Sequence, residues 1–420
     1  MKKAYFAILM LSLYGFLNPF GVLSPQIIKF TIYLLVVFGL IIAYNAANKK
    51  GLKINYPRKT YWTLMSGILV SIFMASAFHT QSLSISFMTT LSYIIGYGTL
   101  FLFLKLDISE RDVINVFFWL SVIAIPVYFV NAATYPNMIF GGAVDKGEDL
   151  TRGILRIPMY YLDLMVFFLF YGINQWLEKR SKKWIIWALV CMIMIFLSVT
   201  RQCILFSAVL GLIFLLKKSS WIKRILIIAA TATFIFVVLP AIPAYQAMVE
   251  LSEDQRDSNS EEDDIRIQAY EFYLNSYQTN ELTRIFGNGL PAMGNSPWGN
   301  MVESELDDTG CLYADIGWGG FYWLFGIFSV VALFLLCLFA ITRRKSPSNK
   351  FLSYWIAYFI LYCIAAGPNI YIEQIVIYMV GLYLCFRPQS DNKNPEDESN
   401  GSNNPKLQQR RGLYQLREEC

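Results

Sequence analysis

Residues 184–216 read WIIWALVCMIMIFLSVTRQCILFSAVLGLIFLL, an apolar run in which Arg201 is the only charged residue. As one straight helix this run would be roughly 50 Å long, whereas the hydrocarbon core of a bilayer is about 30 Å thick. The run must therefore turn back on itself. Both flanks, 179–183 and 217–224, are rich in Lys and Arg, which is typical of cytoplasmic loops. We therefore predict a hairpin of two short helices, with both flanks in the cytoplasm and Arg201 at the tip, on the opposite face.

The composition of the whole chain is typical of a polytopic membrane protein. Of its 420 residues, 56% are hydrophobic and 15% are charged, which is more apolar side chain than a water-soluble core could hide. The apolar segments predict an all-α integral membrane protein with about twelve spans. The predicted spans are 5–23, 27–46, 60–79, 84–104, 113–132, 159–177, 184–199, 203–216, 225–246, 317–341, 351–366 and 369–386.

The distribution of basic residues predicts the topology. Alternating the spans from a cytoplasmic N-terminus makes both termini cytoplasmic and satisfies the positive-inside rule at every loop. The net charge of +5 then follows from topology, with no nucleic-acid-binding patch behind it. All but eight of the 35 Lys and Arg residues fall in cytoplasmic segments, and those eight are Lys29, Lys146, Arg152, Arg156, Arg201, Arg256, Arg266 and Arg284.

The segments between and after the spans divide into two long outer loops and a tail. The outer loops are 133–158 and 247–316, the second lying between spans 9 and 10 of a transmembrane domain over 1–386. Residues 387–420 are rich in Asn, Ser and Pro, which predicts a disordered cytoplasmic tail. The seven cysteines have no paired spacing, and the only histidine, His79, is expected to be structural, so no metal site and no cofactor is predicted.

The large outer loop contains residues suited to an anionic glycan. A helical pattern over 265–282 places Arg266, Tyr270 and Tyr273 on one stripe. A guanidinium binds phosphate and aromatic faces stack on sugars, although an interfacial helix with tyrosines at headgroup level has the same pattern. A Gly-rich segment, RIFGNGLPAMGNSPWGN at 284–300, follows, and several carboxylates come after it. Among them Asp308 could act as a general base or position an acceptor hydroxyl, although a solvated loop has the same composition.

Ionisable groups beside the predicted spans form a second set of candidates. Asp163 and Glu373 lie near the outer ends of spans six and twelve, and Arg152 and Arg156 precede span six. An unpaired charge in hydrocarbon costs on the order of several kcal/mol, so such groups usually face a cavity or a partner. All four share the predicted outer face with Arg201. They are therefore candidate substrate contacts, and a structural pairing of Asp163 with a nearby arginine is the alternative.

Three segments resemble the bacterial O-antigen polymerase and ligase superfamily, which includes the Wzy-type polysaccharide polymerases. VTRQCILFSAVLGLIFLL, 199–216, is similar to the Thr-Arg step between two short helices. DIRIQAYEFYLNSYQTNELTRIFGNGL, 264–290, is similar to the family's arginine, amphipathic helix and Gly-x-Gly pattern. DDTGCLYADIGWGGFYWLFGI, 307–327, resembles the segment that closes the large loop. The motifs are short, and the resemblance over roughly 60–386 lies in their order and topology.

The resemblance implies a GT-C-like glycosyltransferase in the bacterial cytoplasmic (inner) membrane, acting at its outer face. The implied enzyme polymerises undecaprenyl-diphosphate-linked oligosaccharide repeat units of a surface polysaccharide, which can be the O-antigen of lipopolysaccharide, a capsule or an exopolysaccharide. It inverts the configuration at the anomeric carbon and uses no metal or nucleotide sugar. The implied partners are undecaprenyl-diphosphate-linked glycans, membrane lipid, a flippase and a chain-length regulator.

On this interpretation Arg201 and Arg266 neutralise the diphosphate, and Asp308 serves the acceptor hydroxyl. Ligases of the superfamily carry a histidine in the closing segment, where this chain has Asp308, so the polymerase branch is favoured. An O-antigen-ligase-type transferase remains an alternative. From another class, so does a lipid-linked oligosaccharide transporter or flippase, because outer-face arginines also suit an anionic cargo. Supporting contacts to phosphate or glycan are expected from Arg152, Arg156 and Arg284.

Overall fold

The structure of the protein is a computed structural model that describes most of the chain as far as Arg387. The described residues are 2–13, 15–16, 24–47, 56–135, 138–140, 157, 159, 161–198, 200–217, 221–222, 224–225, 246, 265–276, 280–343, 345–364, 366–367 and 369–387. They all belong to the first of two units of the chain, Met1–Arg387. The second unit, Pro388–Cys420, lies outside the described residues, and so does the predicted tail apart from its first residue.

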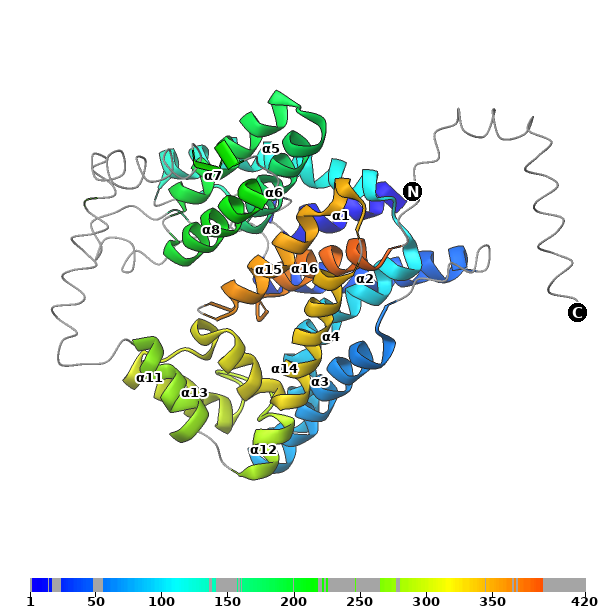
Figure 1. Ribbon diagram of the computed structural model, residues 1–420. Helices are drawn as coiled ribbons and strands as arrows, with labels where there is room; N and C mark the ends of the chain where they lie inside the picture. Colours follow the sequence, from blue (N-terminus) through cyan, green and yellow to red (C-terminus); the bar gives the residue numbers. More distant parts are fainter. Residues whose placement is uncertain are drawn as a thin grey trace, which may run out of the picture. The chain divides into compact units, whose positions relative to one another are not determined.

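The described residues form helices and no strands (Figure 1). The first helices along the chain are α1 (Lys2–Leu13), α2 (Pro25–Ala47), α3 (Arg58–Phe78), α4 (Leu83–Leu106), α5 (Glu110–Thr134), α6 (Leu162–Lys179), α7 (Lys182–Leu197) and α8 (Arg201–Lys217). The helices that follow are α11 (Ile265–Glu271), the π-helix η4 (Phe272–Ser276), α12 (Glu281–Phe286), α13 (Pro297–Thr309), the 3-10 turn η5 (Tyr313–Ile316), α14 (Trp318–Thr342), the 3-10 turn η6 (Pro347–Asn349), α15 (Phe351–Tyr362) and α16 (Ile372–Phe386).

Five of the described helices are long and apolar enough to cross a membrane. They are α3, α4, α5, α14 and the Ile27–Asn45 part of α2. The prediction of an α-helical membrane protein is confirmed at this level. The count of about twelve spans and the GT-C-like arrangement stay predictions, because helices such as α15, with 12 residues, and α16, with 15, are shorter than a usual span.

The first helix is shorter than the predicted span 5–23. It ends at Leu13 after 12 residues, roughly 18 Å of helix, which is less than the hydrocarbon thickness of about 30 Å. Gly15 follows with a φ of 68°, a left-handed conformation that glycine adopts without strain, and its N–H bonds the carbonyl of Ser12. The apolar side chains beyond Leu13 concealed this end, because hydropathy records no backbone conformation.

The predicted helix over 265–282 is also wrong in extent. The chain forms α11 over Ile265–Glu271, one π-helical turn over Phe272–Ser276, and a separate helix, α12, from Glu281 onward. Asn280 caps α12 because its side-chain oxygen accepts from the backbone N–H of Thr283 at 3.0 Å. The amphipathic pattern predicted the start of this segment and missed its break.

Close backbone contacts hold the helices together. In Figure 1, α3 lies beside α4 and α14, and each of these pairs is in extensive contact. The α6–α7 pair packs closely at Gly172, where a Cβ atom would lie 2.5 Å from the carbonyl oxygen of Trp184. Only a residue without a side chain allows the helices to approach this closely, as in many membrane helix pairs.

Helix α14 is interrupted at Gly326, whose φ of 75° and ψ of 173° are not helical. One turn earlier, the carbonyls of Trp323 and Leu324 accept hydrogen bonds of 2.9 Å from the backbone N–H groups of Asn288 and Gly289. A helix break inside a membrane protein is tolerated where other groups satisfy its polar backbone. Here the Gly-rich segment supplies the N–H groups, so it stabilises the kink of α14.

Candidate functional site

Arg201 lies at a turn between two short helices. As predicted, the apolar run 184–216 is divided: α7 ends at Leu197 and α8 begins at Arg201. Within the turn, the hydroxyl of Ser198 donates to the carbonyl of Ile195 at 2.6 Å. The side chain of Arg201 is exposed. Its charge adds to the partial positive charge that the free N–H groups give to any helix N-terminus, which is a favourable place for an anion.

Arg266, from the second residue of α11, lies against the start of α8. The side-chain amide of Gln202 faces its guanidinium. With its oxygen toward Arg266, Gln202 accepts from both terminal nitrogens, at 2.6 and 3.0 Å. Because Gln202 follows Arg201 directly, the two arginines singled out as catalytic lie in one region, although distant segments supply them. We call Arg201, Gln202 and Arg266 the arginine cluster.

A buried polar group lies behind the arginine cluster. Cys203 in α8 accepts a hydrogen bond of 3.0 Å from the hydroxyl of Tyr358 in α15. Asp163, in the first turn of α6, is 1% exposed and accepts a bond of 2.6 Å from the hydroxyl of Tyr378 in α16. Helix α6, which carries Asp163, packs against both α8 and α15. Residues of α6, α8, α15 and α16 therefore meet in this region, and Asp163 is hydrogen-bonded to uncharged side chains, Tyr378 and Gln374.

The Gly-rich segment is packed between two helices. A Cβ atom at Gly287 would lie 2.3 Å from the carbonyl oxygen of Leu324 in α14, and one at Gly289 would lie 2.5 Å from that of Ser71 in α3. Both glycines have positive φ, 84° and 78°. Glycine allows close approach of a backbone, and in the structure the close approach is to helix backbone.

His79 fastens this segment to the end of α3. Its ring is 7% exposed and stacks on Trp298, with centroids 4.2 Å apart and planes 10° apart. Its Nε2 lies 3.0 Å from Oδ1 of Asn288, whose Nδ2 donates to the carbonyl of Trp323. Nε2 is therefore the donor and carries the proton. Burial lowers the pKa of His79, which keeps the ring neutral, and this is the structural role expected of it.

Gln81, two residues further on, makes a second set of bonds to the same segment. Its Oε1 accepts from the backbone N–H of Ala292 at 2.9 Å and from the hydroxyl of Ser296 at 2.8 Å. Its Nε2 donates to the carbonyl of Leu290 at 3.0 Å. Ser296 in turn caps α13 by accepting from the N–H of Gly299. No sequence pattern singles out Gln81, because its partners in the Gly-rich segment lie more than 200 residues away along the chain.

The two predicted tyrosines have different surroundings. Tyr270 is half-buried and donates to the carbonyl of Ile364 at 2.8 Å. Tyr273 is 1% exposed, donates to the carbonyl of Cys311 at 2.8 Å and packs edge-on against Trp323. Neither face of the Tyr273 ring is therefore open to a sugar in this structure, and both tyrosines fasten α11 and η4 to the rest of the protein.

The remaining predicted site residues lie on other elements or outside the described residues. Arg284 is exposed in α12, which packs on α14 and α3, and it pairs with Glu281 at 3.0 Å. Asp308 is exposed near the end of α13, and Glu373 is half-buried in the first turn of α16. Arg152 and Arg156 lie outside the described residues.

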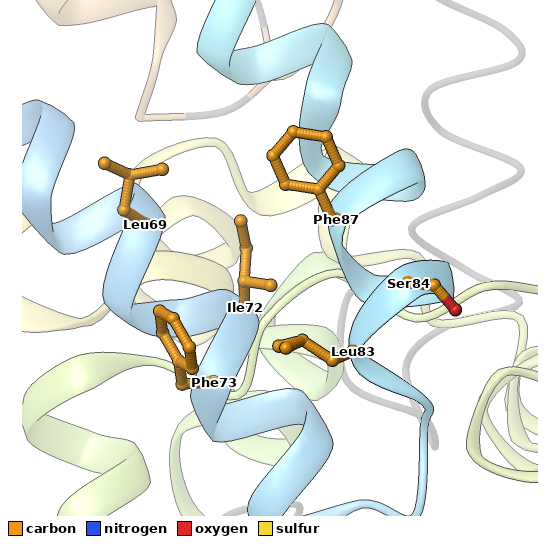
Figure 2. A pocket seen from close by; sticks show the side chains of 6 residues that line it. All are labelled: Leu69, Ile72, Phe73, Leu83, Ser84 and Phe87. Atoms are coloured by element: carbon orange, nitrogen blue, oxygen red, sulfur yellow. The ribbon is translucent and has the colours of Figure 1, made fainter.

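An apolar cavity of about 450 Å³ lies between α3 and α4. Figure 2 shows its lining side chains, which are Leu69, Ile72, Phe73, Leu83, Ser84 and Phe87. This lining suits an alkyl chain better than a sugar or a phosphate. The cavity is next to the corner between α3 and α4 where His79 and Gln81 hold the Gly-rich segment.

The arginine cluster suits an anion, because Arg201 is exposed at a helix N-terminus and the next residue, Gln202, contacts the guanidinium of Arg266. Within the described residues, no group of three His, Cys, Asp or Glu side chains is placed to hold a metal ion.

No protein-family model matches the chain, and no curated protein matches it.

Proposed function

We propose that the protein is a membrane glycosyltransferase that polymerises undecaprenyl-diphosphate-linked oligosaccharide repeat units of a surface polysaccharide. The reaction would take place at the outer face of the bacterial cytoplasmic membrane. The observation that carries the proposal is the contact between Gln202 and Arg266, because it joins the start of α11 to the start of α8, where Arg201 is exposed. Two arginines at the tip of a helical hairpin suit a lipid-linked diphosphate.

The chemistry is a displacement at the anomeric carbon of the growing glycan. The acceptor hydroxyl oxygen forms the new bond to that carbon, and the bond to the diphosphate oxygen breaks on the opposite face, with inversion. The diphosphate leaves with the electron pair, and Arg201 and Arg266 stabilise its growing negative charge. The hydroxyl proton passes to a carboxylate, for which we assign Asp308, because it is exposed and Asp163 is buried.

Other residues would position these groups. The bond from Tyr358 to Cys203 holds the first turn of α8 and so sets the direction of Arg201, and the bond from Tyr378 to Asp163 joins the neighbouring helices α6 and α16. A half-buried Tyr270 leaves part of its ring for a glycan contact, whereas the buried Tyr273 supports the segment from within. Further contacts to the glycan or phosphate are proposed for Arg152, Arg156, Arg284 and Glu373.

The test is a pair of single substitutions, Arg201→Ala and Arg266→Ala, in a strain that lacks the wild-type protein. Each loses half of the positive charge available to the leaving group, so we expect polymer ladders to collapse to a single repeat unit on a polysaccharide gel while immunoblots show normal protein levels. The matched control is Arg111→Ala, which removes an exposed arginine from the first turn of α5. Wild-type chain lengths in both cluster variants would refute the assignment.

The same strain separates the two alternative functions. Without a polymerase, single repeat units reach the surface. Without an O-antigen-ligase-type transferase, long chains accumulate on undecaprenyl diphosphate and fail to reach their final acceptor. Without a transporter or flippase, repeat units remain on the cytoplasmic side.

A further inference from the structure

A basic cavity of about 490 Å³ lies where α8, α14 and α15 end or begin. Its lining contains four cations and two aromatic rings, namely Lys217, Arg343, Lys345, Lys350, Phe214 and Tyr354. Among the described residues, no carboxylate contributes to the lining. Lys217 is in the last turn of α8, Arg343 follows the last residue of α14, and Lys350 precedes the first residue of α15. Three separate elements thus direct positive charge toward one concave site, which is suited to an anion.

Lys345 is built into the wall of this cavity. Its ammonium group donates to the carbonyls of Ile341 and Arg343, at 3.4 and 3.3 Å, and to that of Ala340, and these carbonyls belong to the end of α14. A lysine at this place satisfies carbonyls that have no partner within the helix. Burial lowers the pKa of Lys345, and the neighbouring charge of Arg343 acts in the same direction. A bound anion would offset this crowding of positive charge.

The aromatic side of the cavity joins α8 to α15. Phe214 and Tyr354 are stacked, with ring centroids 4.0 Å apart and planes 14° apart, and Phe214 is 2% exposed. An apolar wall beside a group of cations fits a ligand that is both charged and apolar. Soluble phosphate has no use for such a wall, whereas the headgroup region of a phospholipid presents a phosphate directly above hydrocarbon.

The position of the cavity along the helices also favours a lipid. Helix α14 is one of the helices long and apolar enough to cross a membrane, and it ends at Thr342. Arg343 and Lys345 therefore lie just beyond the end of the apolar span, at the level of the lipid headgroups. The neighbouring basic residues indicate the cytoplasmic surface, where anionic lipids attract Lys and Arg.

We propose that the basic cavity binds the phosphate of an anionic phospholipid. The lipid would tie the last turn of α8 to the connection between α14 and α15. Because Arg201 is the first residue of α8 and Lys217 the last, such a lipid would steady the helix at the end opposite the arginine cluster. This inference does not depend on the proposed glycosyl transfer, and a protein with any activity could be tested for it.

The experiment measures thermal unfolding of the purified full-length protein in detergent with added phosphatidylglycerol, phosphatidylcholine or inorganic phosphate. We expect phosphatidylglycerol alone to raise the unfolding midpoint. The variant Lys217→Gln/Lys350→Gln should need roughly 30-fold more of this lipid for the same shift at low salt, because each lysine near an anionic surface contributes roughly a fivefold factor. The matched control, Lys182→Gln/Lys183→Gln, removes two exposed lysines at the start of α7 and should respond as the wild type does.

A charge-conserving variant distinguishes the loss of a binding charge from misfolding. Lys217→Arg/Lys350→Arg keeps both cations, so it should retain the response to phosphatidylglycerol, and native mass spectrometry should find the lipid on it and on the wild type. An equal shift with phosphatidylcholine would overturn the proposal. So would an equal shift with inorganic phosphate, or a Lys217→Gln/Lys350→Gln variant that binds the lipid as tightly as the control does.

Discussion

Three consecutive residues at the start of α8 have different surroundings and different roles. Arg201 is exposed, Gln202 contacts Arg266, and Cys203 is buried against Tyr358. Successive residues of a helix point in directions about 100° apart, so one turn can present a charge, meet a neighbouring segment and anchor itself in the core. Arg201 thus owes its position to its neighbours, and substitutions at Gln202 or Cys203 act through it.

His79 allows a prediction about pH at the scale of one residue. Its pKa is lowered by burial, so the unfolded chain binds more protons than the folded one below the ordinary histidine pKa of about 6.5. Its contribution to stability is therefore complete above that pH and is lost as the pH falls through the lower pKa of the folded state. We expect the unfolding midpoint of the wild type to fall more between pH 7.5 and pH 5.5 than that of His79→Gln.

The comparison is clean because His79 is the only histidine in the chain, provided that the protein is purified without a histidine tag. Glutamine keeps a donor for Asn288 and does not titrate, while every other group titrates equally in both proteins. Equal pH dependence in the two proteins would show that His79 does not change its protonation on unfolding.

At the scale of elements, the kink of α14 and the Gly-rich segment depend on each other. The kink exposes carbonyls that accept from Asn288 and Gly289, and the glycines leave room for the backbones to meet. Gly326 itself has space for no side chain, since a Cβ atom would lie 2.2 Å from the carbonyl oxygen of Ile285. A helix interrupted in this way is stable only with its partner segment in place.

Alanine substitutions at two glycines of the Gly-rich segment distinguish the energetic cost of a packing clash from that of backbone strain. Gly289→Ala must adopt a positive φ and also places a Cβ 2.5 Å from the carbonyl oxygen of Ser71. Gly294→Ala has the same kind of φ, 70°, and nothing within 4 Å of its Cβ. We expect Gly294→Ala to cost about 1–2 kcal/mol of unfolding free energy, which is the left-handed penalty, and Gly289→Ala to cost clearly more.

Chemical or thermal unfolding in detergent measures both values. The difference between the two variants is the packing contribution at α3, because the backbone penalty is common to both. Equal losses would mean that the Gly-rich segment can move away from α3 without cost.

At the scale of the whole molecule, the main prediction is the topology around α7 and α8. Two helices of 16 and 17 residues joined by a turn fit a helical hairpin that crosses the membrane twice, with its basic flanks on one side and Arg201 on the other. The six described cysteines are all buried, and Cys420 lies outside the described residues, so in a Cys420→Ser background a new surface cysteine can be labelled selectively.

A single cysteine at Thr200 should react with a membrane-impermeant thiol reagent in intact spheroplasts. The matched control is Lys182→Cys at the start of α7, which should react only after the membrane is permeabilised. Both positions flank the same helix, so the contrast reports on the side of the membrane and not on local exposure. Reaction of Thr200→Cys only after permeabilisation would reverse the topology and remove Arg201 from the outer face.

The sequence alone determined the helical class and most helix positions. Apolar runs predicted spans at 60–79, 84–104 and 317–341, and helices α3, α4 and α14 lie within a few residues of them. Helical hydrogen bonds join residues four positions apart, so local hydropathy is enough to find them. The turn before Arg201 also followed from length alone, since the run was too long for one bilayer.

Only the tertiary structure decided which residues meet. The bonds of Gln202 to Arg266, of His79 to Asn288 and of Asp163 to Tyr378 all join segments that are far apart along the chain. Periodicity describes one helix at a time and contains no information on which helix lies beside it. For the same reason Tyr273, which shares a predicted stripe with Arg266, is buried in the core while Arg266 is exposed: the π-helical turn and the packing on Trp323 set its direction.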